Sequence, residues 1–207
     1  MKDKYQNMIN KTKQFFDGKI ADAKGKTDKT MWNDDLSRQQ IRFDEIYRFM
    51  DSNDASVMDI GGANGDFYTY LKSKGFKGSY MSVDIHETFL ADGRKKHPEC
   101  KFINTDILTD TSLRPCDYVV MSGLFNGNYG QDFDFIKNFV IRMYGLCKKK
   151  LVFNALTTRH LNHASDALYR IDPCMFLDFI INEVSPLVEL RHFYLSFNYT
   201  VCITKGK

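Results

Sequence analysis

The stretch of sequence that decides the fold reads Val57-Met58-Asp59-Ile60-Gly61-Gly62-Ala63-Asn64-Gly65-Asp66-Phe67. An apolar strand leads directly into a run of small residues, and a helical pattern follows them at once. Glycines permit positive φ angles, so the backbone can turn tightly beside a ligand. Asp59, at the strand end, can accept hydrogen bonds from loop amides or from an ammonium group. The stretch therefore predicts a ligand-binding turn between a strand and a helix, in which Gly62 is only a turn residue.

Short apolar strands alternate with helical patterns after this turn. Strands are expected at residues 56–60, 80–85, 101–104, 117–122 and 150–156, separated by helices such as 67–74 and 133–147. Such alternation with near-continuous apolar strands predicts a parallel sheet that is covered on both faces, in a doubly wound arrangement.

The end of the chain has a different pattern. After a helix at residues 173–184, two strand-like runs at 187–194 and 197–205 are separated by too few residues for a crossover helix. They are therefore expected to pair as an antiparallel hairpin. The predicted fold class is α/β, with a seven-stranded, doubly wound, mostly parallel sheet that ends in an antiparallel hairpin.

The first 31 residues form a polar segment that stands apart from this alternation. Their apolar residues fit an irregularly amphipathic helix that ends near Gly18 or Gly25. A second helix is expected from about residue 36 to residue 50, with Asp35 as its cap. We therefore expect an N-terminal helical lid or extension at residues 1–31, and a single domain at residues 32–207.

Composition places the chain among ordinary globular proteins, with 43% hydrophobic and 27% charged residues. The formal net charge is +3 and the lysines are spread along the chain, so no nucleic-acid partner is expected. The cysteines show no metal-ligand spacing, so neither a metal site nor a disulfide framework is expected. A polar N-terminus and the lack of a long apolar run predict a cytoplasmic protein without a membrane partner, as a monomer or a homodimer.

Two further acidic residues end neighbouring strands. Asp84 lies about 20 residues beyond the glycine turn, where a carboxylate can bind both hydroxyls of a ribose. Asp106 falls on the same edge of the sheet, where it can accept a hydrogen bond from the exocyclic amine of adenine. Each acid alone could equally be a helix cap or a solvated loop residue. Together with Asp59, they favour a ligand that contains adenosine.

On these motifs the sequence resembles the class I S-adenosylmethionine-dependent methyltransferases over roughly residues 32–207. Asp59 to Gly65 is similar to their acidic-x-Gly-x-Gly-x-Gly first motif, although Ala63 stands at the middle glycine, and Ser122-Gly123-Leu124-Phe125-Asn126 is similar to the fourth motif. The resemblance implies the Rossmann-like methyltransferase fold and S-adenosyl-L-methionine as the cofactor. It also implies cofactor contacts from Asp59, Gly61, Ala63, Asn64, Gly65, Asp84, Ile85, Asp106, Ile107, Ser122 and Gly123.

The segment before the first motif adds further candidates for the cofactor site. Its stretch from Trp32 to Gln39-Gln40-Ile41-Arg42-Phe43 resembles small bacterial methyltransferases of undefined substrate. Trp32 could lie over the cofactor, or it could anchor the N-terminal helix in an apolar groove. Gln39 and Arg42 could contact the cofactor carboxylate, because arginine presents a two-pronged donor to carboxylates, but an exposed ion pair would explain the arginine as well.

Histidines supply the candidates for a general base. His160 and His163 follow the fifth expected strand, where a doubly wound sheet presents its active-site loops, although either could be a surface loop residue. His86 is expected near the adenosine. Alternation along the sixth strand places His192 and Tyr194 on one face, as a core-facing pair.

The predicted function is methyl transfer from S-adenosylmethionine to an oxygen or nitrogen atom of a small-molecule acceptor. Two other classes stay open at this point, a protein that binds the cofactor without transfer and an NAD-dependent oxidoreductase. The turn lacks the full Gly-x-Gly-x-x-Gly spacing of the oxidoreductases. An RNA acceptor is disfavoured, because the sequence has no Asn/Asp-Pro-Pro-Tyr-type motif and no RNA-binding appendage.

Overall fold

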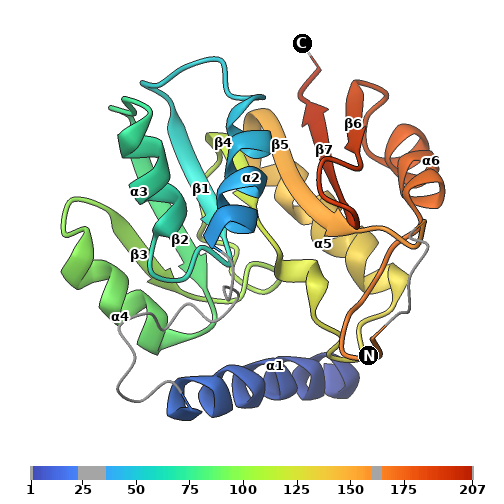
Figure 1. Ribbon diagram of the computed structural model, residues 1–207, viewed down its shortest axis with the longest axis horizontal. Helices are drawn as coiled ribbons and strands as arrows, with labels where there is room; N and C mark the ends of the chain where they lie inside the picture. The colour runs from blue at the N-terminus through green and yellow to red at the C-terminus, as the bar shows by residue number, and fades with distance from the viewer. Residues whose placement is uncertain (1, 23–35, 160–164, 207) are drawn as a thin grey trace.

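The computed structural model describes residues 2–22, 36–159 and 165–206. Their centre is a seven-stranded sheet in the order β3-β2-β1-β4-β5-β7-β6 (Figure 1). The strands are β1 (Ser56–Ile60), β2 (Ser79–Asp84), β3 (Lys101–Asn104), β4 (Cys116–Met121), β5 (Cys147–Leu156), β6 (Val188–His192) and β7 (Asn198–Thr204). Pairing is parallel from β3 to β5, whereas β7 runs antiparallel to both β5 and β6. The predicted fold class is therefore confirmed, including the antiparallel hairpin.

Helices cover both faces of the sheet. On one face lie α2 (Leu36–Tyr47) and α3 (Asp66–Ser73), and on the other lie α5 (Phe133–Leu146) and α6 (Pro173–Glu183) (Figure 1). The fourth helix, α4 (Glu87–Lys96), packs beside β2 and β3. The central strands are covered from both sides, and residues 118–121 of β4 are fully buried. This double cover explains why these strands appear in the sequence as continuous apolar runs.

The N-terminal helix α1 (Lys2–Asp22) lies across the edge of the sheet where the parallel strands finish (Figure 1). It passes through Gly18 and ends at Asp22, between the two positions expected from the sequence. The Tyr5 hydroxyl donates a hydrogen bond to Asp106, just beyond the end of β3. Met8 is buried beneath the helix, so α1 is docked on the sheet edge by apolar as well as polar contacts.

The C-terminal hairpin departs from the expected pattern at its turn. His192 ends β6 with an exposed side chain, and Phe193 then adopts a positive φ of 70°. This left-handed residue interrupts the alternation that a continuous strand would maintain. His192 Nε2 lies 2.9 Å from Thr157 Oγ1, whereas the Tyr194 hydroxyl accepts a hydrogen bond from Thr200. The expected core-facing pair of His192 and Tyr194 is therefore wrong.

Candidate active site

The ends of β1, β2 and β4 border a cavity of about 400 Å³ whose outer walls come from α1 and α2. The order of the strands reverses between β1 and β4, and open α/β sheets bind their ligands at such a switch point. The structure brings ten of the predicted cofactor-site residues together around this cavity, namely Gln39, Arg42, Asp59, Gly61, Ala63, Asn64, Asp84, Ile85, Ser122 and Gly123.

The turn after β1 borders the cavity with its backbone in the left-handed region. Gly61 has a φ of 70°, and Ala63 has a φ of 45° although it carries a Cβ atom. The Gly61 amide donates to the Val83 carbonyl at 2.8 Å, and the Ala63 amide donates to Asp84 Oδ2 at 3.2 Å. Both bonds tie the turn to β2, and they hold Ala63 in a conformation that alanine rarely adopts.

Two other glycines in this turn are required by close packing or by their backbone conformation. A Cβ atom on Gly62 would lie 2.8 Å from atoms of Asp59 and Ser82, so close packing against β1 and β2 requires glycine there. Gly62 also lines the cavity, which the sequence had not indicated. Gly65 lies outside the cavity lining, with a φ of 82° at the start of α3. A Cβ atom on Gly65 would lie 3.2 Å from Phe102 and from His97, so close packing as well as the positive φ favours glycine there.

Asp59 is buried at the end of β1, with 4% of its surface exposed, and accepts a hydrogen bond from the Tyr80 hydroxyl at 2.5 Å. Burial raises the pKa of Asp59 to about 7, against the opposing effect of the Tyr80 hydrogen bond, and the Asp84 carboxylate raises it further. Near neutral pH both protonation states are therefore populated. A cation bound beside this group would favour its ionised form.

Asp84 ends β2 and receives a backbone amide on each of its oxygens. Ala63 N donates to Oδ2 at 3.2 Å and His86 N donates to Oδ1 at 2.9 Å. Desolvation raises the pKa of Asp84, and these amides oppose the rise. A carboxylate has about four lone-pair sites, so both oxygens keep acceptor capacity for the hydroxyls of a ligand.

A second, smaller cavity of about 80 Å³ shares part of its lining with the first. Ile85, Ile107 and Asp106 line it beside the ends of β2 and β3, and Tyr5 of α1 lines its outer side. Asp106 Oδ1 accepts from Leu108 N at 2.9 Å, and Oδ2 accepts from the Tyr5 hydroxyl. Apolar walls with a carboxylate at the rim suit a flat heteroaromatic ring that carries an amine.

Helix α2 brings Gln39 and Arg42 to the wall of the cavity. Arg42 Nε is buried and has no hydrogen-bond partner in the described part of the chain. Burial lowers the pKa of Arg42, which is the sign of a guanidinium that lacks full solvation. A carboxylate in the cavity would supply both the charge and the acceptor that this side chain needs.

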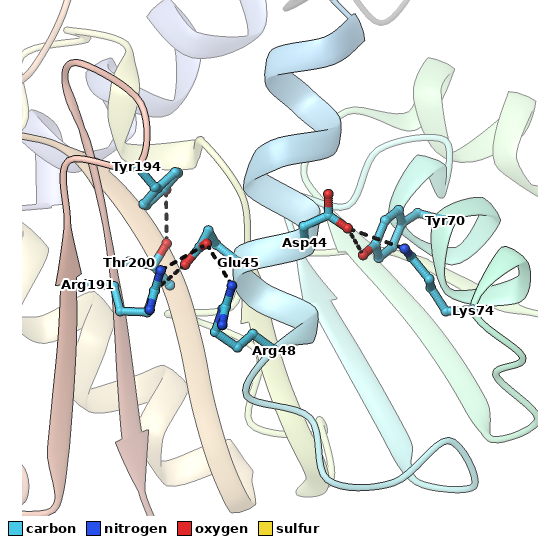
Figure 2. Close-up of polar contacts among 8 residues, drawn as sticks. All are labelled: Asp44, Glu45, Arg48, Tyr70, Lys74, Arg191, Tyr194 and Thr200. Atoms are coloured by element: carbon cyan, nitrogen blue, oxygen red, sulfur yellow. Dashed lines mark hydrogen bonds and ion pairs between the residues drawn. The ribbon is translucent and has the colours of Figure 1, made fainter.

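Polar contacts on both flanks hold α2 in this position (Figure 2). Toward the C-terminal hairpin, Glu45 accepts a hydrogen bond from Arg191 Nε at 2.6 Å, and Arg48 lies 3.6 Å from the same carboxylate. Toward α3, Asp44 accepts a hydrogen bond from the Tyr70 hydroxyl at 2.5 Å. The orientation of Gln39 and Arg42 therefore depends on the contacts of α2 with the C-terminal hairpin and with α3.

The turn after β4 provides the remaining wall, and it leads into the short 3-10 helix η1 (Leu124–Asn126). Gly123 has a φ of 80°, and its amide donates to Asn154 Oδ1 at 2.8 Å. Ser122 Oγ accepts from Asn154 Nδ2 at 3.2 Å. Asn126 and Tyr129 line the cavity beyond this turn. Asn126 is the last residue of the stretch that resembles the fourth motif. That resemblance could have indicated Asn126 as a site residue, but it was not among the predicted ones.

Three predicted residues cannot be placed in this site. Trp32, His160 and His163 lie outside the described residues. His86 lines the cavity next to Asp84, and its Nε2 lies 3.1 Å from Asp17 Oδ1 of α1.

Within residues 2–22, 36–159 and 165–206, no group of His, Cys, Asp and Glu side chains is arranged to hold a metal ion. None of the helices in these ranges is both long and apolar enough to cross a membrane.

Solved structures of other proteins share this architecture. The N-methyltransferase NodS of Bradyrhizobium japonicum WM9, in complex with S-adenosylhomocysteine, gives a TM-score of 0.68 at 14% identity and covers 95% of this chain and 100% of its own. DhpI in complex with S-adenosylhomocysteine gives a TM-score of 0.69 at 14% identity, over 98% of this chain and 99% of its own. At this level of identity the likeness concerns the fold.

Sequence comparison adds a relative from Mycobacterium tuberculosis, the inferred methyltransferase Rv1506c. It is 26% identical over 157 residues, which cover 73% of this chain and 93% of the relative. The profile of the FtsJ-like methyltransferase family matches residues 41–170. The matched region contains the glycine turn, Asp84, Asp106 and the turn after β4.

The fold and the strand-end residues define a class I S-adenosylmethionine-dependent methyltransferase, with S-adenosyl-L-methionine as its cofactor. Since the family profile spans more than half of the sequence, the chain belongs to the FtsJ-like methyltransferase family. The two other classes left open by the sequence, an NAD-dependent oxidoreductase and a protein that only binds the cofactor, are set aside on this ground.

Proposed function

We propose that the protein transfers the methyl group of S-adenosylmethionine to an oxygen or nitrogen atom of a small molecule. The observation that carries the proposal is the enclosure of the 400 Å³ cavity between the sheet edge, α1 and α2. Pockets of roughly 300–1,000 Å³ bury most of the surface of a small ligand. A cavity covered by a helix in this way suits a compact acceptor better than a nucleic-acid strand.

We assign the methionine part of the cofactor to the region between β1 and α2. Asp59 would bind the ammonium group, and Arg42 with Gln39 would bind the carboxylate. The support is that Asp59 is buried with a raised pKa and that Arg42 Nε is buried without a partner, so each group gains from an opposite charge. The flanking turns would border the sulfonium through Gly61, Ala63, Asn64, Ser122 and Gly123, whereas Gly65 would act by shaping the start of α3.

We assign the adenosine to the ends of β2 and β3. Asp84 would accept hydrogen bonds from the ribose hydroxyls, and Asp106 would accept one from the adenine amine. Ile85 and Ile107 line the smaller cavity, and they would lie against the adenine ring there. Because the Tyr5 hydroxyl already donates to Asp106, the adenine amine would share this carboxylate with α1.

The cofactor brings an activated methyl group on a positively charged sulfur, so the chain has chiefly to align the acceptor and exclude water. Helix α1 is placed for the second task, and we propose that residues 1–31 act as a lid. A general base is needed only for an acceptor that must lose a proton before attack. His160 and His163 stay our candidates for that base.

RNA is the second candidate acceptor, because members of the FtsJ family often act on RNA. The two acceptors can be separated with cofactor labelled in its methyl group. The protein is incubated with either the small-molecule filtrate or the purified total RNA of a bacterial lysate, and Asp84→Ala, which should bind the cofactor more weakly, serves as the control with reduced transfer. We expect label in the filtrate, resistant to ribonuclease. Label that enters RNA and not the filtrate would refute a small-molecule acceptor.

A further inference from the structure

We propose that His86 connects the cofactor to the N-terminal helix, so that binding of the cofactor strengthens the attachment of α1 over the cavity. One ring nitrogen of His86 pairs with a hydroxyl of the cofactor ribose, and the other holds Asp17 of α1. The inference rests on the proposed function only through the place assigned there to the adenosine. It applies to a small-molecule acceptor and to RNA alike.

The two nitrogens of the His86 ring are in different states. The side chain is 8% exposed, and its Nε2 lies 3.1 Å from Asp17 Oδ1. Nδ1 is buried as well, but it has no hydrogen-bond partner in the described part of the chain. Proteins pair nearly all of their buried polar atoms. Since His86 lines the 400 Å³ cavity, the unpaired nitrogen points to a ligand that supplies the missing partner.

The local structure gives Nδ1 no other role. His86 is the N-cap residue of α4, a position from which a side-chain acceptor commonly receives a backbone amide of the first turn. The His86 side chain makes no such capping hydrogen bond. Helix α4 therefore begins without help from the imidazole, and the polar contacts of the ring are made outside this helix.

The covalent geometry of histidine places Nδ1 at the inner end of the ring, toward Asp84. Nδ1 is bonded to the ring carbon nearest the main chain, whereas Nε2 lies at the far end. The main-chain amide of His86 donates to Asp84 Oδ1 at 2.9 Å, so the inner end of the ring starts beside the carboxylate assigned to the ribose. The ring packs against Phe89 and Phe16, with centroids 4.7 Å and 6.4 Å away, which holds its orientation.

A ribose hydroxyl is a chemical match for the open nitrogen. A carboxylate only accepts hydrogen bonds, so Nε2 carries a proton and donates to Asp17. Nδ1 is then an acceptor in the neutral ring and a donor in the charged ring. A hydroxyl group has one proton and two lone pairs, so it pairs with Nδ1 in either state. The ribose hydroxyls are the cofactor groups assigned to the adjacent Asp84, and we therefore assign one of them to Nδ1.

Helix α1 is attached near both of its ends to the strand ends assigned to the adenosine. The Tyr5 hydroxyl donates to Asp106 after β3, and Asp17 accepts from His86 after β2. The Asp17 side chain is 68% exposed, so solvent weakens its contact when the contact stands alone. A ribose hydroxyl on Nδ1 fixes the ring and polarises the Nε2–H group, which strengthens the bond to Asp17.

Such a coupling acts in both directions. If the bound cofactor stabilises the docked helix, the docked helix stabilises the bound cofactor by the same factor. Asp17 therefore raises cofactor affinity although it does not line the 400 Å³ cavity. It is a positioning residue that acts through His86, and it makes cofactor binding and the covering of the cavity one coupled step.

The ribose contact is tested by calorimetry with S-adenosylhomocysteine and its 2′-deoxy and 3′-deoxy analogues. In the parent protein, loss of the hydroxyl that pairs with Nδ1 should weaken binding by roughly tenfold. His86→Phe keeps a ring and removes both nitrogens, so the same deletion should cost at least about threefold less. His97→Phe is the matched control, because His97 follows the other end of α4, pairs with Thr69 and lies outside the cavity linings. It should leave all three affinities within about twofold of the parent.

The coupling to α1 is tested with Asp17→Ala and Asp17→Asn. We expect S-adenosylhomocysteine affinity to fall about two- to fivefold in Asp17→Ala. Asp17→Asn should restore part of it, because the amide oxygen still accepts from Nε2. Hydrogen exchange should show that the protection α1 gains from the ligand is about threefold smaller in His86→Phe and Asp17→Ala than in the parent. Lys11→Ala, at another exposed position of α1, should match the parent.

Three results would overturn the inference. Hydroxyl deletions that cost the same in His86→Phe as in the parent would leave Nδ1 without a ribose contact. Unchanged affinity in both Asp17 variants would separate α1 from the cofactor. A parent protein that tolerates both deletions would remove the ribose from Asp84, and the inference with it. Because Asp17 is exposed, Asp17→Ala with the deoxy analogues replaces His86→Phe if that variant does not fold. All of these measurements use ligands without an acceptor, so label that enters RNA would refute the small-molecule acceptor alone.

Discussion

On the two flanks of the cavity, the carboxylate at the end of β2 and the polar groups after β4 differ in how far the protein itself satisfies them. On the cofactor flank, Asp84 already accepts hydrogen bonds from the amides of Ala63 and His86. On the other flank, Asn126 Oδ1 and the Tyr129 hydroxyl have no partner among the described residues. The difference indicates that the Asp84 carboxylate is oriented before a ligand binds, whereas the groups after β4, like Arg42 Nε and His86 Nδ1, can gain a partner from a molecule in the cavity.

Removal of residues 1–28 is expected to have the largest effect, and to lower methyl transfer more than cofactor binding. The domain should still fold and bind S-adenosylhomocysteine, because its core lies in the sheet, while methyl transfer should fall by about a hundredfold once the acceptor site loses its cover. Thermal melts, calorimetry and the label assay measure the three quantities, and Lys11→Ala on the exposed side of α1 is the control.

Hydrogen exchange tests the same lid without an acceptor. Amides of α1 should become protected when S-adenosylhomocysteine is added. Strong protection already present in the free protein would make the segment a fixed brace and contradict the lid.

Asp84→Ala should affect the opposite flank. We expect cofactor affinity to weaken by roughly 1–3 kcal/mol, the usual cost of losing charge-assisted hydrogen bonds in a partly buried site. Calorimetry with S-adenosylhomocysteine measures the loss, and Asp54→Ala at an exposed position before β1 serves as the control. Unchanged affinity in a folded variant would take Asp84 out of the ribose site.

The pKa of Asp59, about 7, predicts a pH dependence on the cofactor flank alone. An ammonium ligand favours the ionised carboxylate, so S-adenosylhomocysteine affinity should rise about tenfold from pH 6 to pH 8. In the unfolded chain the pKa of Asp59 is 3.8, so between about pH 4 and pH 7 Asp59 carries more bound proton in the folded protein than in the unfolded chain. The stability contribution of Asp59 therefore falls as the pH rises through this range.

Asp59→Asn should flatten both pH profiles, as measured by calorimetry and thermal melts over this range. An affinity in the parent protein that is constant from pH 6 to pH 8 would refute the ammonium contact.

Glu45→Gln should have the smallest effect, because it acts on the cavity only through the position of α2. The Arg191 side chain is 44% exposed, so solvent screens the pair, and we expect a stability loss of about 1 kcal/mol with an affinity change below about threefold. Chemical denaturation measures the first value and calorimetry the second, with Glu189→Gln on the exposed side of β6 as the control. A larger loss of affinity than of stability would show that Arg191 orients Arg42 directly.

The cofactor flank could be predicted from the sequence because its signals are local. The bounds of β1 and β3 agree with those expected from the apolar runs, and each acid lies within two residues of the end of its strand. The limit is visible at β5, which begins at Cys147, three residues before the expected start. Lys148 and Lys149 are exposed, so the sequence there looks polar although its backbone pairs with β4.

The packing of α1 on the cavity could not be predicted because it joins residues that are far apart in the chain. Tyr129 packs against Phe16, which comes from a helix more than a hundred residues earlier, and no local pattern encodes that contact. The role of Gly62 likewise depends on Ser82 in the neighbouring strand. The left-handed turn at Phe193 has no signal in the sequence either, because phenylalanine seldom adopts that conformation.

The place of β7 in the sheet has a consequence for biosynthesis. This strand follows every other element along the chain, yet it fills the interior position between β5 and β6. A ribosome adds roughly 5–20 residues per second, and until residues 198–204 have emerged, β5 presents an unpaired edge that can associate with other chains. A nonsense codon just before this strand would therefore yield a polypeptide that keeps the other six strands but goes to chaperones and proteases, instead of an enzyme with reduced activity.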